Sequence, residues 1–213
     1  MKLSLLKNNN QKAYTLVELI VYIAMSGIFT MTVLQAYLTQ TKIHKHQELL
    51  TSLNQELRTG INLMTKEIRM AGCDPLSTGL FGFKDDDDDR FNTDSDSIHF
   101  TSDIDEPADG KASGSKENVT YYLYPSKGSP KKLGRKTGSG YVQPVVENIT
   151  ELSFIYYDLN NDVIKNPSSS LDKIKSVKVT LSGQAYEADP LTNKLITMSV
   201  SSRIWVRNSG LFK

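Results

Sequence analysis

The stretch YTLVELIVYIAMSGIFTMTVLQAYL, residues 14–38, decides how the rest of the chain is organised. It contains one acidic residue, Glu18, and no Lys, Arg, Asp, His or Pro. As a helix, residues 16–38 are about 35 Å long, which is enough to cross the hydrocarbon core of a bilayer. A carboxylate in such a segment costs on the order of 2.5–3.5 kcal/mol near mid-membrane and less towards an interface. We therefore expect Glu18 to have a specific partner that neutralises its charge.

The residues before this stretch differ from a secretory signal. Residues 1–13 are short and polar, carry three lysines, and end on the small residue Ala13. In a secretory signal the apolar region comes before the cleavage site and is removed with it. Here the small residue stands before the apolar run, and the string AYTLVEL begins at that residue.

The string AYTLVEL resembles the type IV prepilin signal. The resemblance implies that prepilin peptidase cuts between Ala13 and Tyr14 and methylates the new amine of Tyr14. Glu18 then becomes the fifth residue of the mature chain. The usual residues of this signal are Gly before the cut and Phe after it, so Ala13 and Tyr14 depart from the common pattern.

The same resemblance gives Glu18 a partner, because in pilin-like assemblies the amine of one subunit meets the glutamate of its neighbour. An unpaired buried charge is strongly unfavourable, whereas a paired one is tolerated. A pair between the Tyr14 amine and Glu18 would therefore favour assembly and fix the axial register. The alternative is an ordinary signal anchor in which Glu18 reaches towards the membrane interface.

The helix is expected to continue well beyond the apolar stretch. An apolar stripe recurs at spacings of three and four, which is typical of one helix face: Leu49, Leu53, Leu57, Ile61, Met64 and Ile68. The run Ala-Gly-Cys-Asp-Pro at 71–75 ends it, since Gly suits a helix C-terminus and Pro cannot continue the helix. Residues 14–71 would form a helix about 87 Å long.

The segment LNQELRTGINLMTKEIRMAGCDP, residues 53–75, is similar to the corresponding segment of PilW-type minor pilins. The ending IKSVKVTL…LITMSVSSRIWVRN is similar to the C-terminus of the same family. The resemblance implies a long helix whose first half lies in the membrane and whose second half packs on a sheet. We therefore expect an α+β, pilin-like fold with an antiparallel sheet of about four to six strands.

Residues 76–116 are predicted to be an acidic loop that contains a short strand at 97–101. The run Asp85 to Asp89 is unbroken, and adjacent carboxylates repel each other, so a solvated loop is favoured. Calcium is the alternative, because hard cations take several carboxylate oxygens.

The next segments are predicted to be a strand followed by a basic loop. Residues 118–124, NVTYYLY, are β-branched and aromatic, and Pro125 is expected to end the strand. Residues 126–140 are rich in Gly, Ser and Lys and suggest an exposed hairpin tip. Basic residues at 127, 131, 132, 135 and 136 leave open a contact with DNA phosphates, although no aromatic residue is interleaved with them.

A second calcium candidate follows the strand predicted at 148–158, in which Leu152, Phe154 and Tyr156 share one face. Asp158, Asn160 and Asp162 have the spacing that opens a calcium loop. The sixth and twelfth positions, Val163 and Ser169, lack the Gly and Glu of that motif. A turn between strands is favoured, with calcium left as the alternative.

The C-terminal third predicts two more strands, at 173–182 and 194–208, joined by a loop at 184–193. In the last strand, alternation places one set of apolar residues on a shared face: Ile196, Met198, Val200, Ile204 and Val206.

Composition and motifs point away from an enzyme. The chain has 213 residues, 38% of them apolar, a net charge of +1 and a single cysteine, Cys73. One cysteine allows no internal disulfide and no multi-cysteine zinc site. His44 and His46 are two apart on a helix, so they point to different faces. No phosphate loop, GxSxG or HExxH occurs, and no cofactor is expected apart from the calcium alternatives.

The resemblance implies a leader at 1–13, a membrane and assembly segment at 14–40, an amphipathic segment at 41–72 and a β-rich domain at 73–213. It implies a minor pilin that helps to initiate or cap type IV pilus assembly and so supports motility and cell adhesion. Prepilin peptidase, other minor pilins and the major pilin would be its partners. The chain would cross the bacterial inner membrane once, with its domain in the periplasm and later in the fibre.

Two other functions stay open. One is a type II secretion pseudopilin similar to GspJ, which shares the rod and the cleavage. The other is an adhesin or DNA-binding subunit displayed on the pilus, although no nucleic-acid partner is established.

Overall fold

The computed structural model describes residues 14–86, 88, 91–104, 107–114, 116–126 and 128–208. The chain divides into two compact units, Met1–Lys45 and His46–Lys213. The helix α1 (Leu16–Ile68) begins in the first unit and ends in the second.

In the first unit, every residue of α1 from 16 to 42 is exposed. Apolar residues lie on all sides of the helix rather than on one face, as expected from a sequence without helix-period alternation. In the part of the chain that the structure describes, α1 is the one helix long and apolar enough to cross a membrane. That agrees with the prediction made from residues 16–38.

In the second unit, the predicted apolar stripe of α1 is buried at all six positions, and Gly60 is buried with them. A Cβ at Gly60 would lie 2.8 Å from Cγ2 of Val146 and 3.1 Å from Cδ2 of Leu181. The missing side chain therefore lets the helix approach the sheet closely. After Ile68 the chain turns, and Gly72 has a φ of +73°, a conformation that glycine adopts without strain.

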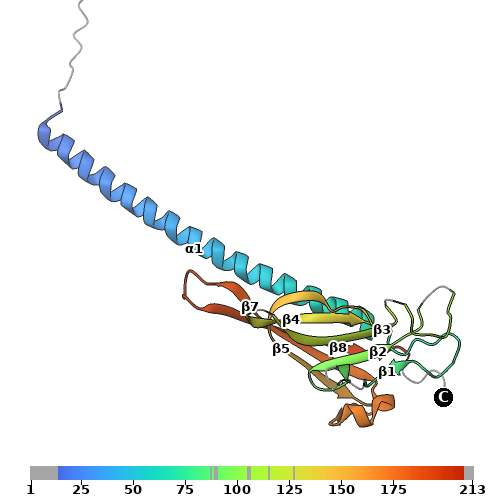
Figure 1. The fold of residues 1–213 in the computed structure, drawn as a ribbon. Helices are drawn as coiled ribbons and strands as arrows, with labels where there is room; N and C mark the ends of the chain where they lie inside the picture. Colours follow the sequence, from blue (N-terminus) through green and yellow to red (C-terminus); the bar gives the residue numbers. More distant parts are fainter. Residues whose placement is uncertain are drawn as a thin grey trace, which may run out of the picture. The chain divides into compact units, whose positions relative to one another are not determined.

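The described residues of the second unit form an antiparallel sheet of eight strands, more than the four to six predicted. The strands are β1 (Gly82–Phe83), β2 (Ser97–Thr101), β3 (Asn118–Ser126), β4 (Gly128–Thr137), β5 (Gln143–Tyr157), β6 (Val163–Ile164), β7 (Ser176–Ala188) and β8 (Leu195–Trp205). Their order is β1-β2-β3-β4-β5-β7-β8, with β6 paired to the end of β5 (Figure 1). Two of the additional strands, β1 and β6, have only two residues each and are too short to give a sequence signal. The 3₁₀ turns η2 (Pro167–Ser169) and η3 (Leu171–Lys173) lie between β6 and β7.

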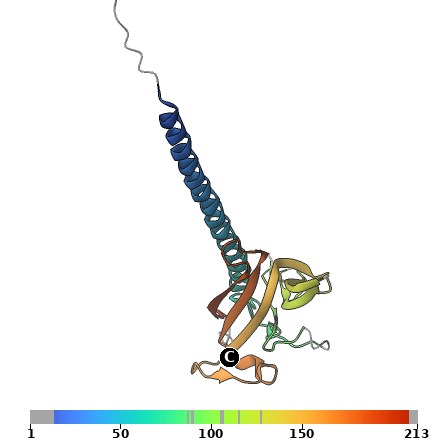
Figure 2. The same cartoon turned by 90° about the vertical axis from the view of Figure 1, so that its left-hand side faces the viewer.

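The core lies between the second part of α1 and one face of this twisted sheet (Figure 2). Leu152, Phe154 and Tyr156 of β5 are buried on one face, as predicted. Alternate residues of β8 also face the core as predicted, and Ile204 is fully buried. A Cβ at Gly183 of β7 would lie 3.1 Å from Cδ2 of Leu57, so the sheet and helix also meet closely there.

The prediction of a loop at residues 126–140 is wrong, because residues 128–137 form the central strand β4. Its Gly, Ser and Lys content is typical of a loop, but β3 and β5 supply ladder partners on both sides. Pro125 lies inside β3 rather than ending it, at a register irregularity between Tyr124 and Ser126. A proline is tolerated there because the ladder is already interrupted.

The prediction for the C-terminal third of the chain also needs correction. β7 begins at Ser176, because residues 171–173 form the 3₁₀ turn η3, and it continues to Ala188. Residues 184–188, half of the loop predicted at 184–193, are therefore strand, and residues 189–194 form the turn that connects β7 to β8. In that turn Asp189 accepts hydrogen bonds from the Thr192 hydroxyl at 2.8 Å and from the amide of Leu191 at 3.1 Å.

Candidate functional site

The start of α1 is the candidate site, because it brings Tyr14 and Glu18 together with Thr15. Glu18 Oε2 accepts hydrogen bonds from the Thr15 amide at 2.9 Å and from the Thr15 hydroxyl at 3.1 Å. In return, the Glu18 amide lies 3.2 Å from Thr15 Oγ1. This reciprocal pair is a capping box, which satisfies amides that a helix start leaves without partners.

The capping box places the Glu18 carboxylate beside the backbone amide that follows Tyr14. The Tyr14 side chain is 79% exposed, and its ring packs edge-on to Tyr22 at 6.4 Å between centroids. Ala13, the residue predicted before the cleavage site, lies outside the described residues. A new amine at Tyr14 would therefore be one residue away from the atom that already donates to Glu18.

Thr15 is a site residue that the sequence analysis does not predict. Its signal is present in the sequence, because Thr-x-x-Glu directly before an apolar run is the pattern of a capping box. The intramembrane charge of Glu18 does not by itself indicate this local role of the carboxylate.

Around this site, large apolar side chains are exposed on every side of the helix. The exposed set between residues 16 and 38 is Leu16, Val17, Leu19, Ile20, Val21, Tyr22, Ile23, Met25, Ile28, Phe29, Met31, Val33, Leu34, Tyr37 and Leu38. A continuous apolar surface of this kind marks a protein-binding or membrane-binding segment. Glu18 is the one acidic residue within it.

The second predicted site, at Asp158, Asn160 and Asp162, is a turn between β5 and β6, as the sequence favoured. Asp158 Oδ1 accepts the Asp162 amide at 2.9 Å, and the Asp158 amide donates to the Asp162 carbonyl at 3.0 Å. The Arg203 guanidinium donates to Asn161 in the same turn and lies over the Tyr157 ring. The turn is therefore closed by its own hydrogen bonds, with a cationic group beside it.

The aspartate run is only partly within the described residues, since Asp87 and Asp89 lie outside them. Asp85 and Asp86 are exposed, in agreement with the solvated loop. Asp85 Oδ1 accepts the Thr93 amide at 2.9 Å, which ties the two ends of the loop together. Among the described residues, no three His, Cys, Asp or Glu side chains are arranged to hold a metal ion.

Four of the five basic residues predicted in a loop lie in β4 instead: Lys131, Lys132, Arg135 and Lys136. The fifth, Lys127, lies outside the described residues. Three of the four contact specific groups. Lys132 forms an ion pair with Glu147, and the Lys136 ammonium lies 3.7 Å from the centre of the Phe91 ring. Arg135 binds Glu67 on α1, with its Nε 2.9 Å from Oε2 and its Nη2 2.9 Å from Oε1. These three cations therefore contact protein groups.

Glu67 is the centre of a half-buried polar cluster that the sequence did not predict. The Tyr121 hydroxyl donates to its Oε2 at 2.5 Å, and Arg135 binds the same carboxylate. Burial raises the pKa of Tyr121 well above its usual value, and the Glu67 charge raises it further. The three groups join the last turn of α1 to β3 and β4, so this cluster has a structural role.

Cys73 is half-buried after the helix end. Burial raises the pKa of its thiol, and the nearby Asp103 and Asp74 carboxylates add to the increase. A thiol that stays protonated is a weak nucleophile.

Comparison with family models, curated proteins and solved structures found no match to this chain.

Proposed function

We propose that this protein is a minor pilin that helps to initiate or cap type IV pilus assembly. In this proposal, prepilin peptidase cuts between Ala13 and Tyr14 and methylates the new amine. The mature chain is held in the inner membrane by residues 14–40, with its β-rich domain in the periplasm. Other minor pilins and the major pilin then pack against the exposed apolar surface of α1.

The observation that carries the proposal is the single carboxylate at the start of an exposed, apolar helix. Glu18 lies close to the chain segment where cleavage would create a positive amine. The apolar side chains around Glu18 are exposed and are not packed in a core. In an apolar environment an unpaired carboxylate is strongly disfavoured, so a neighbouring amine is its natural partner. A subunit-to-subunit pair of this kind would also set how far one helix is displaced along another.

N-terminal sequencing of the mature protein tests the proposal directly. We expect a chain that begins at methylated Tyr14. Mature protein that still begins at Met1, recovered from cells that make normal fibres, would contradict it.

Glu18 variants separate assembly from simple anchoring. We expect Glu18→Val to insert into the membrane as well as the unaltered chain, because it removes a charge from the apolar segment. Incorporation into fibres should fall at least tenfold, because the amine loses its counter-ion. Leu19→Val, a neighbouring change that keeps the charge, is the matched control. Equal incorporation of both variants would show that Glu18 is only an anchor residue.

A further inference from the structure

The two edges of the sheet differ in how they are protected. On one side, the edge of β2 is covered by β1 and by the preceding loop, in which the Lys84 amide donates to the His99 carbonyl at 3.0 Å. The Asp94 amide likewise donates to the Ser97 carbonyl at 3.0 Å. On the other side, β8 pairs with β7 and, among the described strands, with no other. It has 11 residues, so a long edge is left open.

A hydrogen bond at the end of β8 shows which backbone groups of this strand point to the open side. The Val206 amide donates to the Lys175 carbonyl at 3.0 Å, and the register places these two residues directly opposite each other. In an antiparallel ladder, hydrogen-bonded and non-hydrogen-bonded pairs alternate along the strand. Even-numbered residues of β8 therefore bond to β7, and the backbone groups of Thr197, Ser199, Ser201 and Arg203 point outwards.

This edge lacks the features that usually prevent strands from adding to a sheet. Natural edges are interrupted by Pro, by bulges, by inward-pointing charges or by lysines. β8 contains no Pro, Gly or Lys, and its register with β7 is regular from residue 197 to residue 205. Its one charged residue, Arg203, is turned towards Ser176 and the Tyr157 ring.

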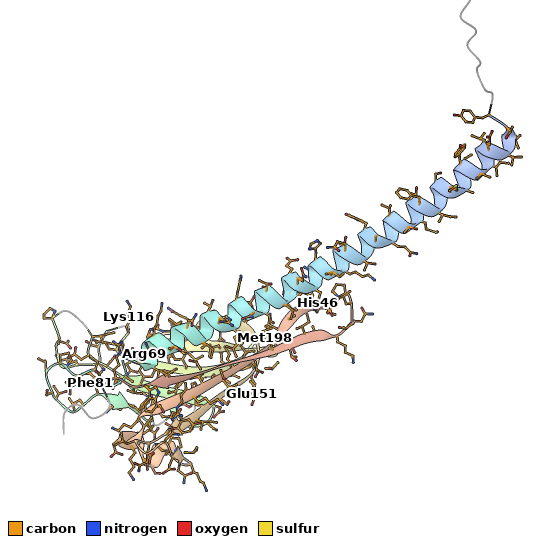
Figure 3. All side chains as sticks on the ribbon, turned by 180° about the vertical axis from the view of Figure 1, so that it is seen from behind. His46, Arg69, Phe81, Lys116, Glu151 and Met198 are labelled. Carbon is orange, nitrogen blue, oxygen red and sulfur yellow. The ribbon has the colours of Figure 1, made fainter. Side chains whose placement is uncertain are left out.

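The core is also incompletely covered along this edge. Ile204 is fully buried, whereas Ile196, Met198 and Val200 on the same face are only half-buried. Met198 lies on the side of β8 that faces α1 (Figure 3). An additional strand with apolar residues at alternate positions would cover these three side chains, because residues of one strand alternate between the two faces of a sheet.

We propose that β8 binds an extended segment of a different protein chain, which adds a strand to this sheet. The segment would pair its backbone with Thr197, Ser199 and Ser201 and place alternate apolar residues beside Ile196, Met198 and Val200. Antiparallel pairing of β8 with a second copy of itself requires a two-fold axis perpendicular to the sheet, which would reverse the direction of α1. Two chains anchored in one membrane cannot be related in this way, so the choice of a different chain rests on the proposed function.

A photo-reactive residue on the full-length chain in its native cells tests the proposal. Placed at Ser199, it should give one cross-linked product whose added mass differs from that of this chain. Placed at Leu159, which is 77% exposed in the β5–β6 turn, it should not give that product. A product of twice the chain's own mass, or no product specific to Ser199, would overturn the proposal.

Proline variants test whether backbone pairing holds the partner. Ser201→Pro removes an outward N–H and leaves the bonds to β7 in place, so the domain should keep its melting temperature within a few degrees. We expect the Ser199 product to fall at least tenfold. Val200→Pro removes a bond to β7 and should lower the melting temperature, which checks the assignment of the two sides.

Thr197→Pro is a second outward position, in case Ser201→Pro does not fold. If the Ser199 product survives in a folded outward-proline variant, strand addition is wrong. A mature chain that begins at Met1 contradicts the pilin function alone, and the loss of the product in the proline variants would still establish strand addition.

Discussion

The two parts of α1 use apolar residues in opposite ways. From residue 16 to residue 42 no side chain is buried, although most are apolar. From Leu49 to Ile68 the apolar residues form one stripe, and that stripe is buried under the sheet. A helix that is apolar on one face can be stabilised by its own domain, whereas one that is apolar all round needs an environment supplied from outside.

The comparison extends to single residue types. Glu18 is held by Thr15 in its own helix turn, but Glu67 is held by Tyr121 and Arg135, which are 54 and 68 residues away in the chain. Gly27 has no neighbour in contact distance of a Cβ, whereas Gly60 is packed against the sheet. The second part of α1 belongs to a folded core, and the first part carries only local interactions.

Truncation of one leucine in each part should give the largest difference in stability between the two parts. Leu57 is fully buried, so Leu57→Ala should lower the free energy of unfolding by about 2–5 kcal/mol through lost burial and a cavity. Leu34, which is 54% exposed, is the matched position in the first part. Leu34→Ala should change the free energy of unfolding by less than about 0.5 kcal/mol. Denaturant unfolding of the full chain in micelles, followed by Trp205 fluorescence, measures both. Equal losses would mean that both parts support the domain.

Adding a side chain at each glycine should give the next largest difference. Gly60→Val forces new methyl groups against Val146 and Leu181, and overpacking of this kind costs about 1–3 kcal/mol. Gly27→Val meets no neighbour and should leave the unfolding of the domain unchanged. Thermal melting of the two variants compares them. A destabilised Gly27→Val would show that the first part is packed against something in the isolated chain.

Alkaline pH should destabilise the folded domain to which the second part of α1 belongs. Burial raises the pKa of Tyr121, and also that of Tyr156, above the value of about 10 for an unfolded chain. Above that pH the unfolded chain releases protons that the folded chain keeps, so stability falls by about 1.4 kcal/mol per pH unit for each tyrosine. Below pH 10 the contribution is fully present.

Above pH 10, Tyr121→Phe should therefore reduce the slope of the unfolding free energy against pH by the contribution of one tyrosine. Tyr156→Phe should have the same effect. Denaturant titrations between pH 9 and pH 11 give the slope. Two variants with the slope of the unaltered chain would rule out ionisation of these tyrosines as its cause.

The smallest expected effect concerns the capping box at the start of the first part. Thr15→Ala removes the cap and should destabilise the first helical turn by about 0.5–2 kcal/mol, whereas Thr15→Ser keeps the hydroxyl. Hydrogen exchange of the amides at residues 16–19 should speed up in the first variant and not in the second. If exchange in the Leu49–Ile68 part accelerates equally, the two parts are coupled more strongly than their contacts suggest.

Sequence reasoning succeeded where the signal was periodic. The six stripe residues of α1 and the alternate faces of β5 and β8 follow directly from their spacing, and β2 begins and ends at the predicted residues. These patterns are visible because burial of one face imposes a period of 3.6 or 2 on the sequence. The Thr-x-x-Glu pattern of the capping box at Thr15 is also visible in the sequence.

Sequence reasoning failed where distant residues decide the structure. β4 has the composition of a loop, but Glu67, Glu147 and Phe91 supply partners for its charged side chains. None of these partners is recognisable from the segment itself. The short strands β1 and β6 likewise form because β2 and β5 offer an edge, which no local propensity encodes.

The capping box has a consequence for the proposed pairing of Glu18 with the amine of a neighbouring subunit. Glu18 already accepts two hydrogen bonds from Thr15, so transfer of its carboxylate to a neighbouring amine exchanges bonds instead of adding new ones. The net gain is then the difference between an ionic and a neutral donor, which is smaller than either alone. If the proposed function is correct, a contact that exchanges hydrogen bonds can be broken with little loss of free energy, and a fibre of such subunits would be able to shorten as well as grow.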